Sequence, residues 1–392
     1  MKIVTRFVIA FIVLVVLAGG AAAGLFIYNN FQEALRHQEM LARQQAAART
    51  LESLTVELPW LMPVPAATAN TPPAITFRFM DQEHTIRPEA NYRIAYGAAT
   101  ADRIKLWNDL WDELWEDTWF DDLDEAEALN EGLRYDSLTF EPQMDHAIES
   151  VLVQLREIRD ERDLSNDEYI ELIVKFVQSI PYCDIHGDLD LYPRPVGCPR
   201  TPIQVLMDGT GDCDEVSMLL AALLHREDYP VSLLLFVPEQ HMALGLRVDG
   251  EGYRGTGYAI VEATSFSYIS EVPENLGDAG VVTLESMPLV LSVGGEIENP
   301  MPYYSAEALA QVERILDVRN RAEVAADNRF AYIERTPMSN AEFNRQRAMY
   351  EACFVPLNRM FPVYPDPTGQ INTIFMDRAE AIAWIDQNAW WE

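Results

Sequence analysis

An uninterrupted apolar run near the N-terminus constrains this chain more than any other feature of its sequence. Residues Phe7 to Tyr28 include no charged side chain, and Lys2 and Arg6 precede them. As a helix, a run of this length extends about 33 Å, enough to cross the hydrocarbon core of a bilayer. The sequence therefore predicts a transmembrane helix with the N-terminus in the cytoplasm and the rest of the chain outside it.

A cleaved signal peptide is the alternative interpretation of the same run. Its apolar region is then 7–17, and the small residues of 18–24 hold the cleavage site. We favour an uncleaved anchor because the apolar run resumes over 25–28. Both interpretations predict a cell-membrane or exported location for the bulk of the chain.

The charge balance restricts the possible partners. The 392 residues include 62 acidic and 29 basic side chains, for a formal net charge of −33. A surface this acidic repels phosphate backbones, so nucleic-acid binding is excluded as a function class. Hydrophobic residues make up 49% of the chain, which is enough for a sizeable core and excludes disorder throughout.

Hydrophobic patterning and proline content divide the chain into five parts. They are 1–28, the cytoplasmic tip and anchor; 29–75, a stalk helix and Pro-rich linker; 76–140, a hairpin and a tryptophan-bearing helix; 141–295, a central domain; and 296–392, a helical C-terminal extension. In the central domain, helices predicted at 167–180 and 213–226 precede strands predicted at 231–237, 241–248 and 257–263. One run of helices followed by consecutive strands is typical of an α+β fold.

Four tryptophans at a spacing of four residues stand out in the third part. Trp107, Trp111, Trp115 and Trp119 share one face of a predicted helix at 103–120. Such a face either packs on the rest of the protein or forms a platform for a sugar or a partner protein. Packing is the simpler interpretation.

The four cysteines suggest one disulfide and one nucleophile. Cys183 and Cys198 flank a 14-residue loop, and the predicted export permits a bond between them. Cys353 then has no partner. The chain has no CxxC or Cys/His spacing of the kind that binds zinc, so we expect no structural metal.

Cys213 is the candidate nucleophile because it opens a predicted helix. Gly209 and Gly211 permit a tight turn just before it, and the positive end of the helix dipole favours a thiolate. The neighbouring acids Asp212, Asp214 and Glu215 partly oppose that effect. We therefore expect a moderately lowered thiol pKa.

A cysteine nucleophile needs a base and a group that orients the base. Among the six histidines, His241 at the start of a strand is the best candidate base, whereas His225 lies about 18 Å along the helix from the thiol. His186 stays open. Glu262, at the end of the next strand, is the candidate orienting group. The alternative is a buried free cysteine, a strand-edge histidine and an ordinary glutamate.

The motifs around these residues resemble those of the transglutaminase-like superfamily, in its prokaryotic membrane-anchored form. The matching stretches are Phe-Val-Gln at 176–178 with Pro-Tyr at 181–182, Gly-Asp-Cys-Asp-Glu at 211–215, the Leu/Ala run at 219–224, His-Met-Ala-Leu-Gly at 241–245 and Glu-Ala-Thr at 262–264. Two departures are Gln204-Val205, where the family often has Glu-Thr, and a glutamate rather than an aspartate as the third triad residue.

The resemblance implies a papain-like core, in which a nucleophile helix packs on an antiparallel sheet. It implies a triad of Cys213 as nucleophile, His241 as base and Glu262 as orienting group, acting on a protein or peptide substrate without a cofactor. Thiol-dependent acyl transfer then makes the protein a protease, an amidase or a protein crosslinker. The alternative function is a non-catalytic envelope module that binds proteins or glycans. The acidic residues near 184–190 and 208–214 lack EF-hand spacing, so solvated acids are the simpler interpretation than calcium.

Overall fold

The computed structural model describes residues 71–90, 95, 135–136, 138–140, 144–182, 199–272, 283–335, 338–348, 359–362 and 375–387. All of these residues belong to one unit of the chain, Trp60–Glu392. In order, its elements are β1 Ile75–Phe79, β2 Gln82–Ile86, α5 Asp145–Arg162, α6 Asn166–Gln178, α7 Pro202–Asp208, α8 Cys213–Arg226, β3 Val231–Phe236, β4 His241–Arg247, η3 Tyr253–Gly255, β5 Tyr258–Val261, β6 Leu289–Ser292, α9 Ala306–Arg335 and α11 Arg378–Gln387.

A short hairpin opens the described chain. Strands β1 and β2 pair antiparallel, and every second residue of β1 is buried. Met80 and Asp81 form the two-residue turn, both with positive φ (45° and 65°), as a hairpin turn of this length requires. Phe77 and Phe79 are completely buried and join the same core as α6 and α8. The hairpin therefore shares the hydrophobic core of the central part of the chain.

The central helices begin at well-defined caps. Ser165 and Glu168 form a capping box at α6, and Thr201 and Gln204 form another at α7. Each box satisfies backbone N–H groups that a helix start leaves without a partner. Gln204, one of the two departures from the family pattern, thus has a structural role at the start of α7.

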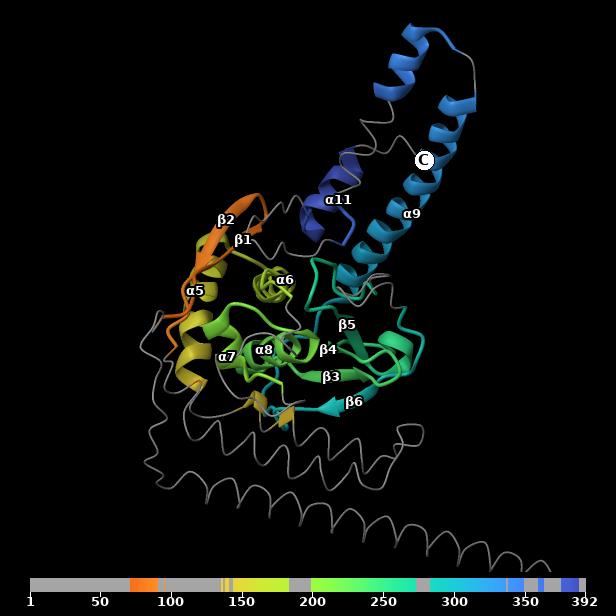
Figure 1. Ribbon diagram of the computed structural model, residues 1–392. Coiled ribbons are helices and arrows are strands. Elements are labelled where there is room, and N and C mark those ends of the chain that lie inside the picture. The colour runs from red at the N-terminus through yellow and green to blue at the C-terminus, as the bar shows by residue number, and fades with distance from the viewer. Residues whose placement is uncertain are drawn as a thin grey trace, which may run out of the picture. The chain divides into compact units, whose positions relative to one another are not determined.

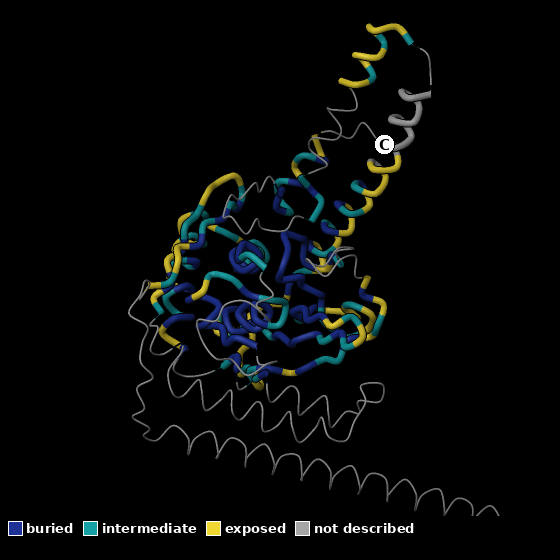
Figure 2. The backbone as a smooth tube through the Cα atoms, in the orientation of Figure 1, coloured by how far each residue is buried: buried dark blue, intermediate teal, exposed yellow. Residues whose placement is uncertain are grey.

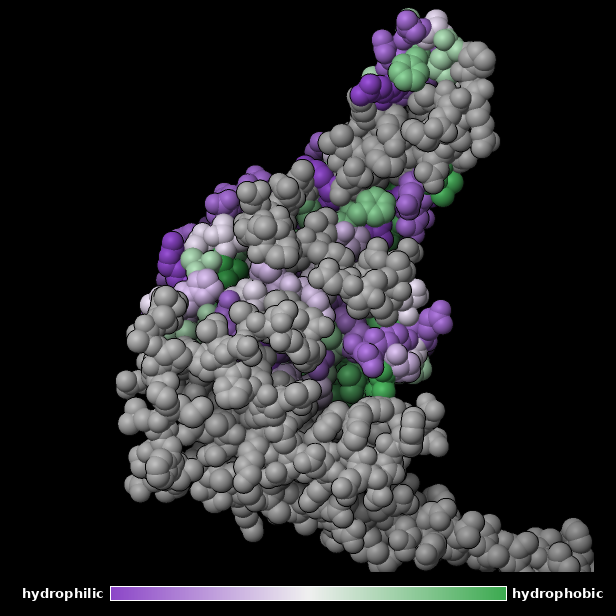
Figure 3. Space-filling view, viewed as in Figure 1, coloured by the Kyte–Doolittle hydropathy of each residue, from purple (hydrophilic) through white to green (hydrophobic). Residues whose placement is uncertain are grey.

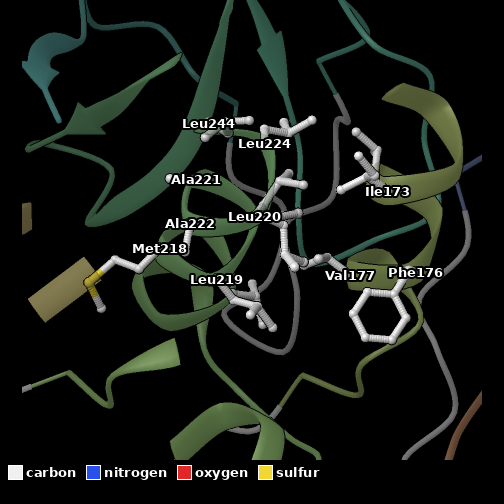
Figure 4. Close-up of a cluster of buried hydrophobic side chains, with 14 of the residues drawn as sticks. Ile173, Phe176, Val177, Met218, Leu219, Leu220, Ala221, Ala222, Leu224 and Leu244 are labelled. Atoms are coloured by element: carbon white, nitrogen blue, oxygen red, sulfur yellow. The ribbon is translucent and has the colours of Figure 1, made fainter. Parts of the chain in front are cut away.

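The second sheet has four strands in the order β5-β4-β3-β6, and all neighbours are antiparallel. Helix α8 packs against β3 and β4 and is covered in turn by α6 (Figure 1). Figure 4 shows the contact: side chains of α8, such as Leu220 and Leu224, lie between α6 and Leu244 of β4. The two elements that carry Cys213 and His241 are thus fixed by one hydrophobic core.

The last described helices, α9 and α11, pack on each other and on the segment that follows β5. Phe266 and Tyr268 share a buried cluster with Ile315 of α9 and Ile385 of α11. In Figure 2, α6, α8 and the four-stranded sheet are mostly buried, whereas the β1–β2 turn and the helical residues 340–348 are largely exposed. The C-terminal helices therefore contact the core next to the candidate site.

The fold class predicted from the sequence is wrong and is corrected here. The described chain is a mixed α and β fold with two small antiparallel sheets, one of them the predicted hairpin. None of the helices in the described ranges is long and apolar enough to cross a membrane; the longest, α9, has 30 residues but is interrupted throughout by Glu, Asp and Arg. The predicted anchor at 7–28 lies outside the described residues, so the membrane location stays a prediction.

Several predicted elements are present, and others were missed. The predicted helices at 167–180 and 213–226 correspond to α6 and α8, and the three predicted strands correspond to β3, β4 and β5. Helices α5 and α7 and strand β6 were not predicted. Strand β6 has only four residues and is recognised only by its pairing with β3.

The described part of the chain exposes a few large hydrophobic side chains. On the face seen in Figure 3, hydrophobic and hydrophilic residues of the described chain alternate over short distances. The large exposed hydrophobic residues come from separate segments: Val153, Met287, Met301, Tyr303, Val324 and Phe343.

Candidate active site

Cys213 lies at the first position of α8, as the sequence predicts. Asp212 caps the helix: its carboxylate accepts from the N–H of Glu215 at 3.0 Å, and Glu215 accepts from the N–H of Asp212 at 3.0 Å. Gly211 is required by close packing, because a Cβ there would lie 2.8 Å from Val216. The Gly-Asp-Cys sequence thus builds a tight turn that ends with the thiol on the first turn of the helix.

A buried arginine, Arg200, stabilises this turn through hydrogen bonds. Arg200 donates through Nε to Glu215 at 2.8 Å and through Nη1 to Asp208 at 3.0 Å, and its backbone N–H donates to Glu215 at 2.7 Å. Arg200 and Glu215 are both buried, and each compensates the charge of the other. Arg200 was not predicted as a site residue, because nothing in the local sequence pattern separates it from a surface arginine.

His241 and Glu262 form a direct buried pair. The ring Nε2 of His241 lies 2.8 Å from Oε2 of Glu262, and Glu262 is completely buried. The register of β4 and β5 explains the contact. Leu244 pairs with Val261, so one step further Glu262 lies opposite Ala243, two residues from His241 on the same face. The structure thus places the two residues together as the sequence predicts.

Other groups hold the Glu262 carboxylate and its backbone. Its Oε1 accepts from the N–H of Thr264 at 2.9 Å and from the Thr264 hydroxyl at 2.5 Å. The side-chain amide of Gln178, near the end of α6, donates to the backbone carbonyl of Glu262 at 2.8 Å. The sequence analysis used Gln178 and Thr264 only as parts of motifs. The structure makes both of them supports of the orienting residue.

The electrostatics of this pair favour its charged form. Burial opposes ionisation of both groups, but the neighbouring Glu262 charge and hydrogen bond still raise the pKa of His241. In the same way, His241 and the Thr264 hydrogen bonds keep the pKa of Glu262 below its usual range despite burial. Because Glu262 is then ionised, it also determines the tautomer of the neutral His241 ring. In that form the proton lies on Nε2, facing Glu262, and Nδ1 carries the lone pair.

The thiol behaves in the opposite way, and here the sequence-based expectation is wrong. Burial raises the pKa of the Cys213 thiol well above its usual range, and the charges of Asp214 and Asp212 add to that rise. The backbone N–H of Met242 donates toward the sulfur and acts in the other direction. The helix dipole is therefore outweighed by burial and by two carboxylates of the same turn.

The three predicted residues lie in one neighbourhood. The sulfur faces the N–H of Met242, which directly follows His241, and the charges of His241 and Glu262 act on Asp214 and Cys213 respectively. The thiol itself donates to Oδ1 of Asp214 at 3.5 Å, and Oδ2 of Asp214 accepts from the hydroxyl of Tyr135 at 3.0 Å. Asp214 and Tyr135 are thus additional groups at the sulfur.

A second buried ionic cluster lies on the same face of α6 as Gln178. Lys175 pairs with Asp377 at 3.1 Å, and its Nζ lies 4.7 and 4.3 Å from the ring centres of Phe266 and Phe375. One turn earlier, Glu171 pairs with Arg378 at 2.5 Å. Burial raises the pKa of Glu171 to about 7. This cluster fastens the C-terminal segment to the turn that follows Glu262.

Some predicted features lie outside the described residues. They are the disulfide between Cys183 and Cys198, the unpaired Cys353, the tryptophans at 107–119, His186 and the acids at 184–190. Among the described residues, no group of three or more His, Cys, Asp or Glu side chains is arranged to hold a metal ion. His225 lies at the other end of α8, where its ring contacts Phe140.

Comparison with known proteins adds no assignment. No family model, no curated protein and no solved structure is significantly similar to this chain. The candidate site therefore depends on its own geometry and on the resemblance of its motifs.

Proposed function

We propose that this chain is a transglutaminase-like protein that transfers acyl groups through Cys213, His241 and Glu262. One observation supports the proposal above the others: a buried histidine–glutamate pair, 2.8 Å apart, lies beside a helix that begins with a cysteine. Burying two ionisable groups is unfavourable unless their charges compensate each other, and such buried pairs are common at functional sites. A nucleophile, a base and an orienting carboxylate at one place are the parts that acyl transfer requires.

The proposed reaction begins with transfer of the thiol proton to Nδ1 of His241, the ring nitrogen that does not face Glu262. The sulfur attacks the carbonyl carbon of a peptide or side-chain amide, and a C–S bond forms. The C–N bond of the amide then breaks, and the departing amine takes the proton from the imidazolium. Throughout these steps Glu262 stabilises the charged ring and fixes its orientation.

The acyl group leaves in a second step of the same kind. Water or a primary amine attacks the thioester, gives its proton to His241, and the thiol is restored. Water as acceptor makes the protein a protease or amidase, and a lysine side chain makes it a crosslinker. Backbone N–H groups at the start of α8 are the donors we assign to the oxyanion of both tetrahedral intermediates.

A binding module without catalytic activity is the second candidate function. The observation that favours it is the raised pKa of Cys213, because a neutral thiol is a poor nucleophile. This candidate requires that His241 and Glu262 are only a structural pair. It predicts that the thiol reacts independently of His241.

The test is formation of a covalent acyl-enzyme. The full-length protein is incubated with a 4-nitrophenyl ester as acyl donor, and intact-mass and peptide spectra locate the adduct. We expect an acyl group on Cys213 in the wild type, none in Cys213→Ala, and a rate lower by about 10²-fold or more in His241→Ala, since general-base catalysis typically contributes that much.

Two results separate the candidate functions. Loss of the adduct in His241→Ala, with Glu262→Gln intermediate, supports acyl transfer. An equal adduct rate in the wild type and His241→Ala would contradict the mechanism and favour the binding module. His225→Ala, a histidine on α8 far from the thiol, is the matched control and should react like the wild type.

A further inference from the structure

The three acidic residues at the start of α8 have different structural roles. Asp212 is the N-cap, and Glu215 completes the capping box and pairs with Arg200. Both positions are explained by stabilisation of the helix start. Asp214 has neither of these roles, and its two oxygens face other groups.

Asp214 instead contacts the sulfur. Its Oδ1 accepts from the thiol of Cys213 at 3.5 Å, within the range of a hydrogen bond to sulfur, and its Oδ2 accepts from the hydroxyl of Tyr135 at 3.0 Å. Tyr135 is buried and belongs to a segment 79 residues away in the chain. The hydrogen bond of Tyr135 therefore fixes the carboxylate beside the thiol from outside the helix.

A carboxylate in this position stabilises the S–H form of cysteine and opposes the thiolate. The other ionisable groups near the sulfur are Asp212 on the same turn, Glu262 after β5 and His241 on β4. The two acids act on the thiol in the same sense as Asp214, which agrees with its raised pKa. Among these ionisable groups of the described chain, a charged His241 has the opposite effect and favours the thiolate.

We propose that Asp214 is a further residue of the candidate site, which keeps Cys213 as a neutral thiol in the resting protein, and that Tyr135 positions it. The inference depends on the proposed function only in naming Cys213 as the nucleophile. In the activating step the S–H group turns from Asp214 to His241. There the S–H bond breaks and the Nδ1–H bond forms, with no other reactant. Asp214 thereby limits reaction of the thiol before a substrate occupies the site.

The experiment measures alkylation of Cys213 by iodoacetamide between pH 5 and 10 in the full-length protein. Peptide spectra follow the Cys213 peptide alone, which gives a rate constant and an apparent thiol pKa for each variant. For Asp214→Asn we expect an apparent pKa lower by about one unit and alkylation at pH 7 faster by about tenfold. Tyr135→Phe should shift the pKa in the same direction by less, because Asp214 loses a donor that stabilises its charge.

Asp249→Asn is the matched control, since it removes an exposed aspartate just beyond the far end of β4 from His241. It should alkylate like the wild type. Circular dichroism identifies any variant that fails to fold, and Tyr135→Phe decides the question if Asp214→Asn does not fold. The proposal is overturned if the folded Asp214→Asn, or otherwise the folded Tyr135→Phe, keeps the thiol pKa of the wild type.

This outcome is independent of the acyl-enzyme test. If Asp214→Asn alkylates faster while His241→Ala leaves acylation unchanged, Asp214 controls the thiol but acyl transfer is wrong. If acylation requires His241 while Asp214→Asn alkylates like the wild type, acyl transfer holds and the role of Asp214 is wrong.

Discussion

The two halves of the candidate site differ in the charges that surround their ionisable groups. In the half formed by His241 and Glu262, opposite charges face each other, and each raises the tendency of the other to ionise. In the half formed by Cys213 and Asp214, the neighbouring groups are acids that oppose the thiolate. One half is therefore organised for an ion pair and the other for neutral groups. The reaction starts from the neutral imidazole: the thiol proton passes from Cys213 to Nδ1 of His241, and this transfer creates the charged ring that Glu262 stabilises.

Hydrogen bonding follows the same division. The Glu262 carboxylate is held by His241 and by both donors of Thr264, which suits a permanent charge. The carboxylate of Asp214 accepts from a neutral hydroxyl and a thiol, and burial raises its pKa. Glu215, one residue further along α8, is buried like Glu262 and, like it, faces a basic side chain, that of Arg200. Glu262 and Glu215 therefore differ from Asp214 in their hydrogen-bond partners: each of the two glutamates contacts a basic side chain.

The largest expected effect is loss of the charge on Glu262. We expect Glu262→Ala to lower the free energy of unfolding by about 3–5 kcal/mol, because it leaves a buried histidine without its partner. Glu262→Gln keeps a hydrogen-bond acceptor and should cost less. Cys213→Ser, on the neutral side, should cost about 1 kcal/mol or less, because no charged partner is stranded. Urea unfolding followed by circular dichroism checks the order, and equal costs for Glu262→Ala and Cys213→Ser would remove the distinction between the two halves.

The pH dependence of stability should have a different form in the two halves: a maximum at intermediate pH for His241 and Glu262, and a change in one direction for Asp214. The raised pKa of His241 contributes stability that is full below its ordinary value of 6.5 and is lost as pH rises through the folded value. The lowered pKa of Glu262 contributes stability that is full above 4.5 and is lost as pH falls through the folded value. The cost of Glu262→Gln should therefore be greatest between about pH 4.5 and 6.5.

Asp214 should show a trend in one direction only. Its pKa is raised by burial, so the wild-type residue favours folding most below 3.8 and progressively less as pH rises through the folded value. Relative to the wild type, Asp214→Asn should gain stability from pH 4 to pH 8. Urea unfolding of both variants at pH 4, 5.5 and 8 measures these trends. A parallel pH profile for Glu262→Gln and Asp214→Asn would contradict the comparison.

The smallest effect tests the support of the histidine half from α6. Gln178→Leu removes the amide that donates to the backbone carbonyls of Glu262 and Ser267. We expect a loss of about 1–3 kcal/mol, the cost of leaving a buried acceptor without its donor. The apparent pKa of the Cys213 thiol should change little, since Gln178 contacts only the half with Glu262. Gln154→Leu on α5 removes a similar amide remote from the site and serves as the control. If Gln178→Leu shifted the thiol pKa more than Asp214→Asn does, the two halves of the site would not be independent.

Local sequence was sufficient to find the elements of the site. The turn that ends at Gly211, an acidic cap and a long apolar run predict where α8 begins, because helix starts depend on the adjacent residues. Two apolar strands separated by a glycine-rich turn predict an antiparallel pair, and that pairing brings Glu262 near His241. The fold class was wrong because the helices α5 and α7 and the strand β6 were not predicted, and β6 is recognised only by its pairing with the distant strand β3.

The sequence by itself determined that Cys213 begins a helix, and that His241 begins one strand and Glu262 lies at the end of the next, since both depend on spacing along the chain. Only the tertiary structure decided the charge state of the site. Tyr135, Arg200 and Gln178 come from distant segments, and no periodicity connects them to the residues they support. The pKa of a buried group depends on its loss of hydration, on its hydrogen bonds and on every charge around it. The helix dipole is a property of one turn of α8, whereas folding made Cys213 half-buried and brought acids to its thiol from more than one segment.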